Sequence, residues 1–152
     1  MNEQGANESA RAIDLQVEVP GTPEQVWEAI ATGPGVTAWM HPTEIEERAG
    51  GSYSFDMQLG AGSNDTGHVT DYDRPHRFAT DGVRWQPQGE APAATLATEW
   101  LIETSDGGTC TVRMVMSGFG TGDVWNEEID GMAAGMRQAL EALRTYLQGV
   151  VR

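Results

Sequence analysis

The sequence predicts an α+β fold in which a curved antiparallel sheet of about six to seven strands grips one long C-terminal helix. Two observations lead to this prediction. From Asp123 to Tyr146 the large apolar residues recur at steps of three or four, which places them on one face of a helix. Much of the chain before it alternates between apolar and polar residues, as half-buried strands do. The apolar stripe and the apolar sheet face must cover each other.

The first elements are a strand and two short helices. Residues 12–19 alternate in polarity and are expected to form the strand. Thr22 to Gln25 have the sequence Thr-Pro-Glu-Gln, a capping box with proline at the first helical position, so a short helix follows until Gly33. A second helical segment, 36–40, ends before Pro42.

The remaining strands occupy the middle of the chain. They are expected to start at Ile45 and to continue at 52–58, 67–72, 77–85, 95–104 and 109–117. The segments between them are rich in residues that favour turns, such as Ser105 to Gly108. Connections this short join antiparallel neighbours. The two short helices are expected to fill the gap between the first and second strands.

Composition limits the possible functions. The chain has 152 residues and a net charge of −14, and all nine of its basic residues are arginine, so it repels nucleic-acid backbones and anionic membranes. No apolar run approaches the ~20 residues of a membrane-spanning helix, and residues 1–11 lack the apolar core of a signal peptide. We expect a disordered tail at 1–11, one domain at 12–149, a cytoplasmic location, and a buried, inert thiol at Cys110.

An apolar pocket is predicted beside the N-terminal half of the long helix. That half carries methionine, alanine and glycine, whereas the C-terminal half is rich in leucine, and methionine adapts to irregular spaces. The residues expected to line the pocket are Trp39, Phe55, Met57, Trp85, Trp100, Met114, Met116, Met132 and Met136. Such a pocket suits a small apolar or aromatic molecule, and plain core packing is the alternative interpretation.

Polar chemistry is sparse in this sequence. His68 and Thr98 are possible polar anchors for a ligand. A histidine beside a carboxylate can act as a general base, but strand alternation places His68 and Asp71 on opposite faces. No catalytic residue, metal site or cofactor is therefore expected, and the glycine-rich segment 118–122 lacks the lysine of a phosphate-binding loop. Trp125 either marks a contact patch or, as we favour, covers the open end of the sheet.

Several segments match one family in order and spacing. They are Thr22 to Ile30, Trp39 with Pro42, Gly50 to Phe55, Gly67 to Val69, Asp73 to Phe78, Gly107 to Thr109, Ser117 to Phe119, Gly131, and Leu140 to Leu147. In these the chain resembles the START-like, helix-grip (SRPBCC) superfamily, and within it the bacterial relatives of the activator of heat-shock protein 90 ATPase. It departs from the pattern at Met132, where the family often has tryptophan, and at Met116, where it often has histidine.

The resemblance implies a helix-grip fold and leaves three functions open, because the superfamily contains carriers, enzymes and co-chaperones. Our leading hypothesis is a non-catalytic domain that binds a small hydrophobic molecule. One alternative is a chaperone-associated interaction domain active in the stress response. Another is an enzyme of polyketide cyclase or hydrolase type. The protein is expected to be a monomer, or a homodimer formed through an exposed sheet edge.

Overall fold

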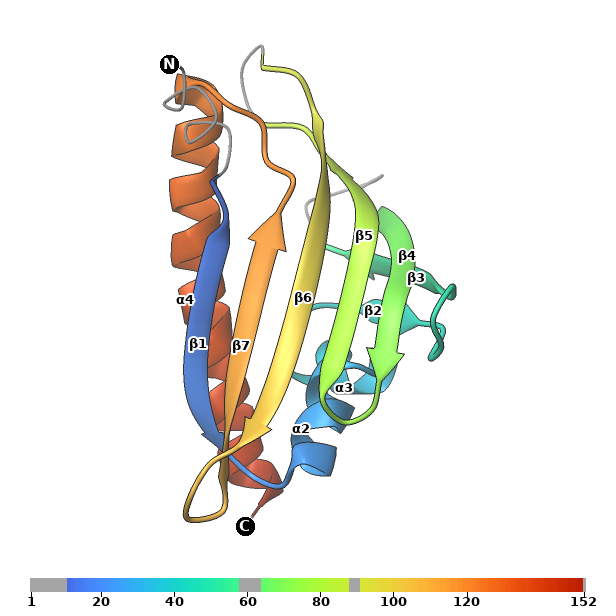
Figure 1. The fold of residues 1–152 in the computed structure, drawn as a ribbon, viewed down its shortest axis with the longest axis vertical. Helices are drawn as coiled ribbons and strands as arrows, with labels where there is room; N and C mark the ends of the chain where they lie inside the picture. Colours follow the sequence, from blue (N-terminus) through green and yellow to red (C-terminus); the bar gives the residue numbers. More distant parts are fainter. Residues whose placement is uncertain (1–10, 58–63, 88–90, 152) are drawn as a thin grey trace, which may run out of the picture.

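The computed structural model describes residues 11–57, 64–87 and 91–151. In chain order its elements are β1 (Ile13–Pro20), α2 (Pro23–Ile30), α3 (Gly33–Trp39), β2 (Thr43–Ile45), β3 (Ser52–Asp56), β4 (Asn64–Asp73), β5 (Arg77–Trp85), β6 (Ala94–Thr104), β7 (Thr109–Ser117) and α4 (Asp123–Val150). Figure 1 shows the sheet with the long helix α4 lying behind β1 and β7. The predicted α+β fold is confirmed. The tail expected at 1–11 lies outside the described residues except for Arg11, which forms an ion pair with Asp130.

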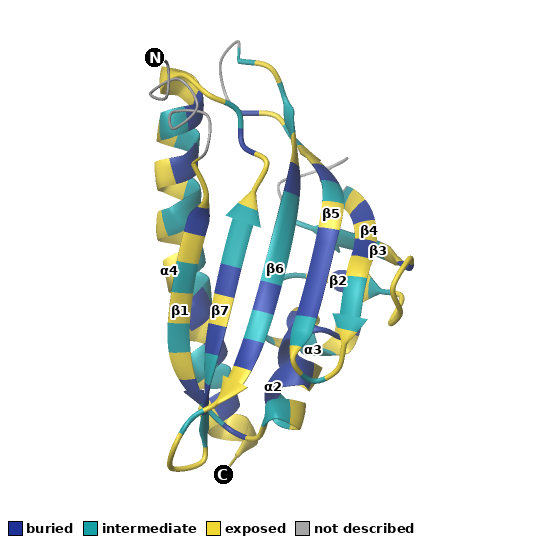
Figure 2. Cartoon of the chain, in the orientation of Figure 1, coloured by how far each residue is buried: buried dark blue, intermediate teal, exposed yellow. Residues whose placement is uncertain are grey.

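The seven described strands form one antiparallel sheet in the order β1-β7-β6-β5-β4-β3-β2. The chain therefore returns at its end to the strand with which it began, and β1 pairs with β7 along its whole length. Burial alternates along β1, as its sequence predicts (Figure 2). The register shifts between Val69 and Asp71 in β4 and between Thr80 and Val83 in β5. Such irregularities bend strands, so this half of the sheet curves.

Helix α4 holds its leucine-rich half against the sheet. It has 28 residues and extends four residues beyond the expected end at Tyr146. Its buried residues are Trp125, Ile129, Leu140, Leu143 and Leu147. Met132 and Met136, between the two buried groups, are only partly buried. The helix is thus anchored in the core at both ends of its stripe and packs less tightly in the middle.

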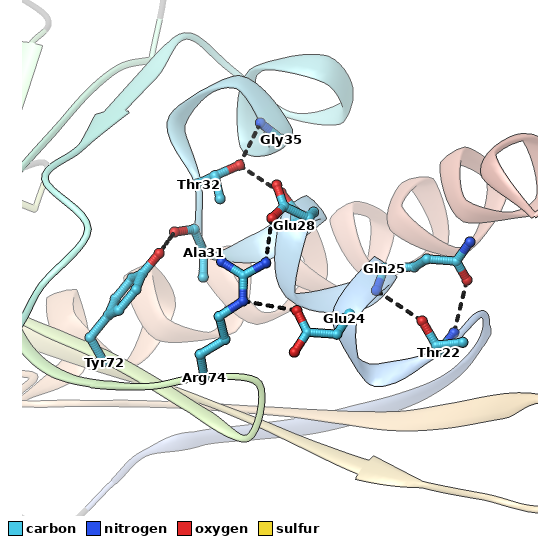
Figure 3. Close-up of polar contacts among 9 residues, drawn as sticks. All are labelled: Thr22, Glu24, Gln25, Glu28, Ala31, Thr32, Gly35, Tyr72 and Arg74. Carbon is cyan, nitrogen blue, oxygen red and sulfur yellow. Dashed lines mark hydrogen bonds and ion pairs between the residues drawn. The ribbon is translucent and has the colours of Figure 1, made fainter.

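The two short helices close one end of the space between sheet and α4. The capping box at α2 is confirmed: Thr22 Oγ1 accepts from the Gln25 backbone N–H at 3.1 Å, and the Gln25 side chain accepts from the Thr22 backbone N–H at 2.9 Å (Figure 3). Arg74, after β4, pairs with Glu24 and Glu28 of α2. These contacts fix α2 to the sheet, and α3, which follows α2 directly in the chain, lies beside the cavity described below.

Two single residues also match their predictions. Cys110 is buried, and its thiol donates to the Gly21 carbonyl at 3.4 Å. Trp125 is buried against Phe119, and its indole N–H donates to the Pro92 carbonyl at 2.9 Å, so it covers the end of the sheet instead of forming an exposed patch. Within the described ranges, none of the helices has the length and apolar character needed to cross a membrane.

Candidate functional site

A cavity of about 140 Å³ lies between the sheet, the methionine-containing part of α4 and the segment around α3. Strands β3, β5, β6 and β7 supply its floor and sides. Eight of the nine residues predicted to line a pocket surround it: Trp39, Phe55, Met57, Trp85, Trp100, Met116, Met132 and Met136. Further apolar lining comes from Ile30, Val36, Met40, Phe78, Val83 and Leu96. The structure thus brings together residues that lie more than 90 positions apart in the sequence.

The indoles of two tryptophans in the lining are held by their polar ends. Trp39 Nε1 donates to the Ala29 carbonyl at 2.8 Å. Trp85 Nε1 donates to Glu128 Oε2 of α4 at 2.7 Å. The N–H of a buried tryptophan usually finds a partner, and these bonds fix both rings while their apolar surfaces line the cavity.

Met114 and His68 lie away from the cavity. Met114 is fully buried in the core and pairs in register with Leu15 of β1 and Trp100 of β6. Met114 faces inward, as the alternation along its strand predicts, but its position along β7 places it among core residues and not at the cavity. The His68 side chain is 72% exposed, with Nδ1 at 4.0 Å from Asp81 Oδ1. The expected polar anchor at His68 therefore points to the outer face of the sheet.

The bulge in β4 corrects one sequence-based argument. Simple alternation places His68 and Asp71 on opposite faces, but the register shifts between Val69 and Asp71. Val69 is buried, and Tyr72 packs its ring against Trp27, so these residues face inward although they are three positions apart. His68 and Asp71 consequently both face outward. Asp71 pairs with Arg77 there and not with the histidine.

The cavity has four polar lining residues, of which only Thr98 was predicted as an anchor. The others are His41, Tyr53 and Thr80. Thr80 could have been found from the sequence, because it lies two positions after Phe78 on β5 and strand residues two apart face the same side of the sheet. His41 and Tyr53 carry no comparable signal, because their positions depend on how β2 and β3 fold over the cavity.

Both titratable residues in the lining are held neutral near pH 7. Burial raises the pKa of Tyr53 to about 12. Burial also lowers the pKa of His41, whose ring stacks on Phe55 with centroids 5.0 Å apart. His41 Nδ1 lies 2.9 Å from Thr43 Oγ1, and that hydroxyl donates to the His41 carbonyl. Both contacts are satisfied when Nδ1 carries the imidazole proton.

The lining carries no arginine and no carboxylate among the described residues. Nor do these residues contain a group of three potential metal ligands. Arginine ion pairs lie elsewhere, for example between Arg113 and Asp14 on the exposed face of β7 and β1. Chemically, the site is suited to a neutral apolar molecule that makes few hydrogen bonds.

The family comparison agrees with this architecture. The family model described as Activator of Hsp90 ATPase homolog 1-like protein (AHSA1) matches residues 20–148. The chain belongs to the AHSA1 family. The match begins at the last residue of β1 and extends almost to the end of α4, so it includes every residue that lines the cavity of this AHSA1 chain. No curated protein matches the sequence.

Solved structures share the fold of this AHSA1 chain at low sequence identity. Protein MLL2253 from Mesorhizobium loti superposes with a TM-score of 0.78 and 17% identity, covering 91% of this chain and 97% of its own. The Aha1 dimer from Colwellia psychrerythraea superposes with a TM-score of 0.66 and 17% identity, covering 90% of this chain and 96% of its own. The di-domain ARO/CYC BexL from the BE-7585A biosynthetic pathway superposes with a TM-score of 0.72 and 16% identity, covering 93% of this chain and 48% of its own. Identities this low show the fold alone.

Proposed function

We propose that this AHSA1-family chain binds a small apolar or aromatic molecule in the cavity between its sheet and α4, without catalysing a reaction. The observation that carries the proposal is the cavity itself, which is lined almost wholly by methionine, aromatic and aliphatic side chains. An apolar cavity of about 150 Å³ stays dry and takes up benzene-sized molecules. At about 140 Å³, the cavity of this chain is of that size.

The flexibility of the lining supports the same proposal. The cavity is approached by Met57, just after β3, by Met116 of β7, and by Met132 and Met136 of α4. Unbranched methionine side chains change rotamer at low cost, so the space adjusts to the shape of a ligand. The two methionines on α4 lie where the helix packs least tightly, which gives the cavity room to expand.

A blocking substitution tests the proposal. Met136→Trp places a large ring in the cavity, whereas Val124→Trp places the same ring at an exposed position of the same helix. We expect toluene to bind saturably to the wild type and to Val124→Trp, as measured by calorimetry or ligand-observed NMR, and binding to be lost in Met136→Trp. Absence of saturable binding by the wild type, or equal binding by both variants, contradicts the proposal.

A second candidate function is an interaction with a chaperone. The family description and the fold shared with the Colwellia psychrerythraea Aha1 dimer favour it. The test is the ATPase rate of the heat-shock protein 90 from the same organism with and without this protein, and an unchanged rate counts against it. The same structural neighbour supports a homodimer, which light scattering after size-exclusion chromatography tests directly.

The third candidate is an enzyme of cyclase type, favoured by the fold shared with the di-domain BexL and by His41 at the cavity. With its proton on Nδ1, His41 carries the basic lone pair of the ring on Nε2 and can act as a general base. If an activity is found, His41→Gln should reduce it at least tenfold, because general-base catalysis contributes about 10²–10⁴-fold. Unchanged activity in His41→Gln would remove His41 as the base.

A further inference from the structure

Two threonines lie side by side on the sheet surface that lines the cavity. Thr80 of β5 and Thr98 of β6 are direct cross-strand partners, and both line the cavity. Thr80 is only 4% exposed. Side chains opposite each other in an antiparallel pair have Cβ atoms about 4.5–5.5 Å apart, so the two hydroxyls reach a common point.

Thr80 is buried and Thr98 is half-buried, and neither hydroxyl has a hydrogen-bond partner among residues 11–57, 64–87 and 91–151, whereas the other two buried threonines, Thr32 and Thr43, do. Thr32 Oγ1 donates to the Glu28 carbonyl at 2.7 Å, and Thr43 Oγ1 donates to the His41 carbonyl at 2.9 Å. A hydroxyl that is removed from water without gaining a partner destabilises the folded state. Thr80 therefore differs from the other buried threonines of this fold, and the half-buried Thr98 beside it is unpaired as well.

The hydroxyl of Thr80 remains accessible from the cavity. Within the described part of the chain, Trp27 Nε1 is the one buried side-chain nitrogen or oxygen that is both sealed off and unpartnered. Thr80 Oγ1 is also unpartnered, so it must keep some accessible surface. Since the residue is almost completely buried and lines the cavity, that surface faces the cavity.

We propose that Thr80 and Thr98 form a hydrogen-bonding subsite that selects, among small aromatic molecules, neutral ones with a carbonyl oxygen. A carbonyl oxygen has two lone pairs and can accept from both hydroxyls at once. A carboxylate is disfavoured, because the described lining offers no cation to compensate for its lost hydration. This inference rests on the proposed binding function and adds to it the polar feature of the ligand.

The experiment compares benzaldehyde with styrene. The two molecules have nearly the same shape, but benzaldehyde has a carbonyl oxygen where styrene has a terminal CH2 group. The chain has no lysine, so aldehyde addition to side-chain amines does not interfere. Kd for each probe is measured for the wild type, Thr80→Val and Thr98→Val. Thr98→Ser keeps the hydroxyl, and Thr95→Val removes an exposed hydroxyl from the same strand.

We expect Thr80→Val and Thr98→Val each to raise the Kd of benzaldehyde about tenfold relative to that of styrene, because each variant loses one buried hydrogen bond to the carbonyl oxygen. Thr98→Ser and Thr95→Val should leave the ratio of the two Kd values near that of the wild type, and benzoate should bind more weakly than benzaldehyde.

Two results overturn the subsite while leaving the proposed function intact. They are an unchanged Kd ratio in both valine variants, and benzoate binding as tight as that of benzaldehyde. If the wild type binds neither styrene nor benzaldehyde, the proposed function itself fails, and the subsite fails with it. If a valine variant does not fold, the wild-type Kd values still decide: benzaldehyde binding more tightly than benzoate supports the subsite, and benzoate binding as tightly as benzaldehyde overturns it.

Discussion

The indole N–H of Trp85 donates to the carboxylate of Glu128 at 2.7 Å and so joins the last residue of β5 to the second turn of α4. Met132 lies one helical turn beyond Glu128, on the same side of the helix. Both Trp85 and Met132 line the cavity. The hydrogen bond therefore sets the position of the loosely packed part of α4 over the sheet.

Removing this bond should destabilise the fold. Hydrogen bonds to charged groups contribute about 1.5–3 kcal/mol, so with partial exposure Glu128→Ala should lower the free energy of unfolding by about 1–2 kcal/mol. Urea unfolding followed by circular dichroism measures this change. Glu127→Ala, at the exposed neighbouring position, should stay within about 0.5 kcal/mol of the wild type. Equal losses in the two variants would show that the bond to Trp85 contributes nothing specific.

The two halves of α4 should respond differently to truncation. Leu143 is fully buried, so Leu143→Ala should cost about 2–5 kcal/mol of unfolding free energy. Met136 is partly buried and borders a space that already exists, so Met136→Ala should cost less than about 1.5 kcal/mol. Chemical denaturation of both variants makes the comparison. Similar losses would mean that the methionine half packs as solid core.

The capping box at α2 should have a measurable share in stability. Thr22→Ala removes the acceptor for the Gln25 backbone N–H and should cost about 1 kcal/mol. For a chain of this size that corresponds to a fall in Tm of about 2–4 °C. Thr22→Ser, which keeps a hydroxyl, is the matched control. A Tm for Thr22→Ala equal to that of Thr22→Ser would contradict the prediction.

Stability should depend on pH through His41. Burial lowers the pKa of His41, and the carboxylates of Asp56 and Asp65 act more weakly in the opposite direction. The unfolded chain takes up a proton on this histidine near pH 6.5, while the folded chain resists protonation until lower pH. The stability contributed by the neutral ring is thus present above pH 6.5 and is lost as the pH falls through the lowered pKa.

Urea unfolding at pH 7.5 and 5.0 tests this sign. The wild type should lose more stability than His41→Gln between these values, while exposed His76→Gln should follow the wild type. The comparison between variants removes the contribution of carboxylates that titrate in the same range. If the difference in unfolding free energy between the wild type and His41→Gln is the same at both pH values, His41 has the same pKa in the folded and the unfolded chain, and the prediction is wrong.

Local patterns predicted most of the fold because each of them reports a physical requirement that the chain meets by itself. The spacing from Ile129 to Leu147 reports one helix face, and Thr22 with Gln25 reports a helix start; both are found as expected. The cavity lining was largely predictable for the same reason. Alternation along β6 and β7 identifies Trp100 and Met116 as inward-facing, and the methionines of α4 mark the thin part of the stripe.

What the patterns missed depends on interruptions and on distant contacts. The bulge in β4 reverses the parity argument for His68 and Asp71, and nothing in the sequence marks where the extra residue falls. The partnership of Trp85 with Glu128 joins positions 43 residues apart and follows from the packing of α4. Likewise, the lack of partners for Thr80 and Thr98 emerges only once the neighbouring strands are in register.

The burial of Cys110 has a practical consequence for spectroscopy. It is the sole cysteine of the sequence, it is fully covered, and burial raises its pKa, so its thiol is poorly reactive in the folded protein. A second cysteine introduced at an exposed site would then take up a fluorophore or spin label selectively, without first replacing the native one. Labels attached in this way to α3 and α4 would report whether the distance between the two helices changes when a candidate ligand is added.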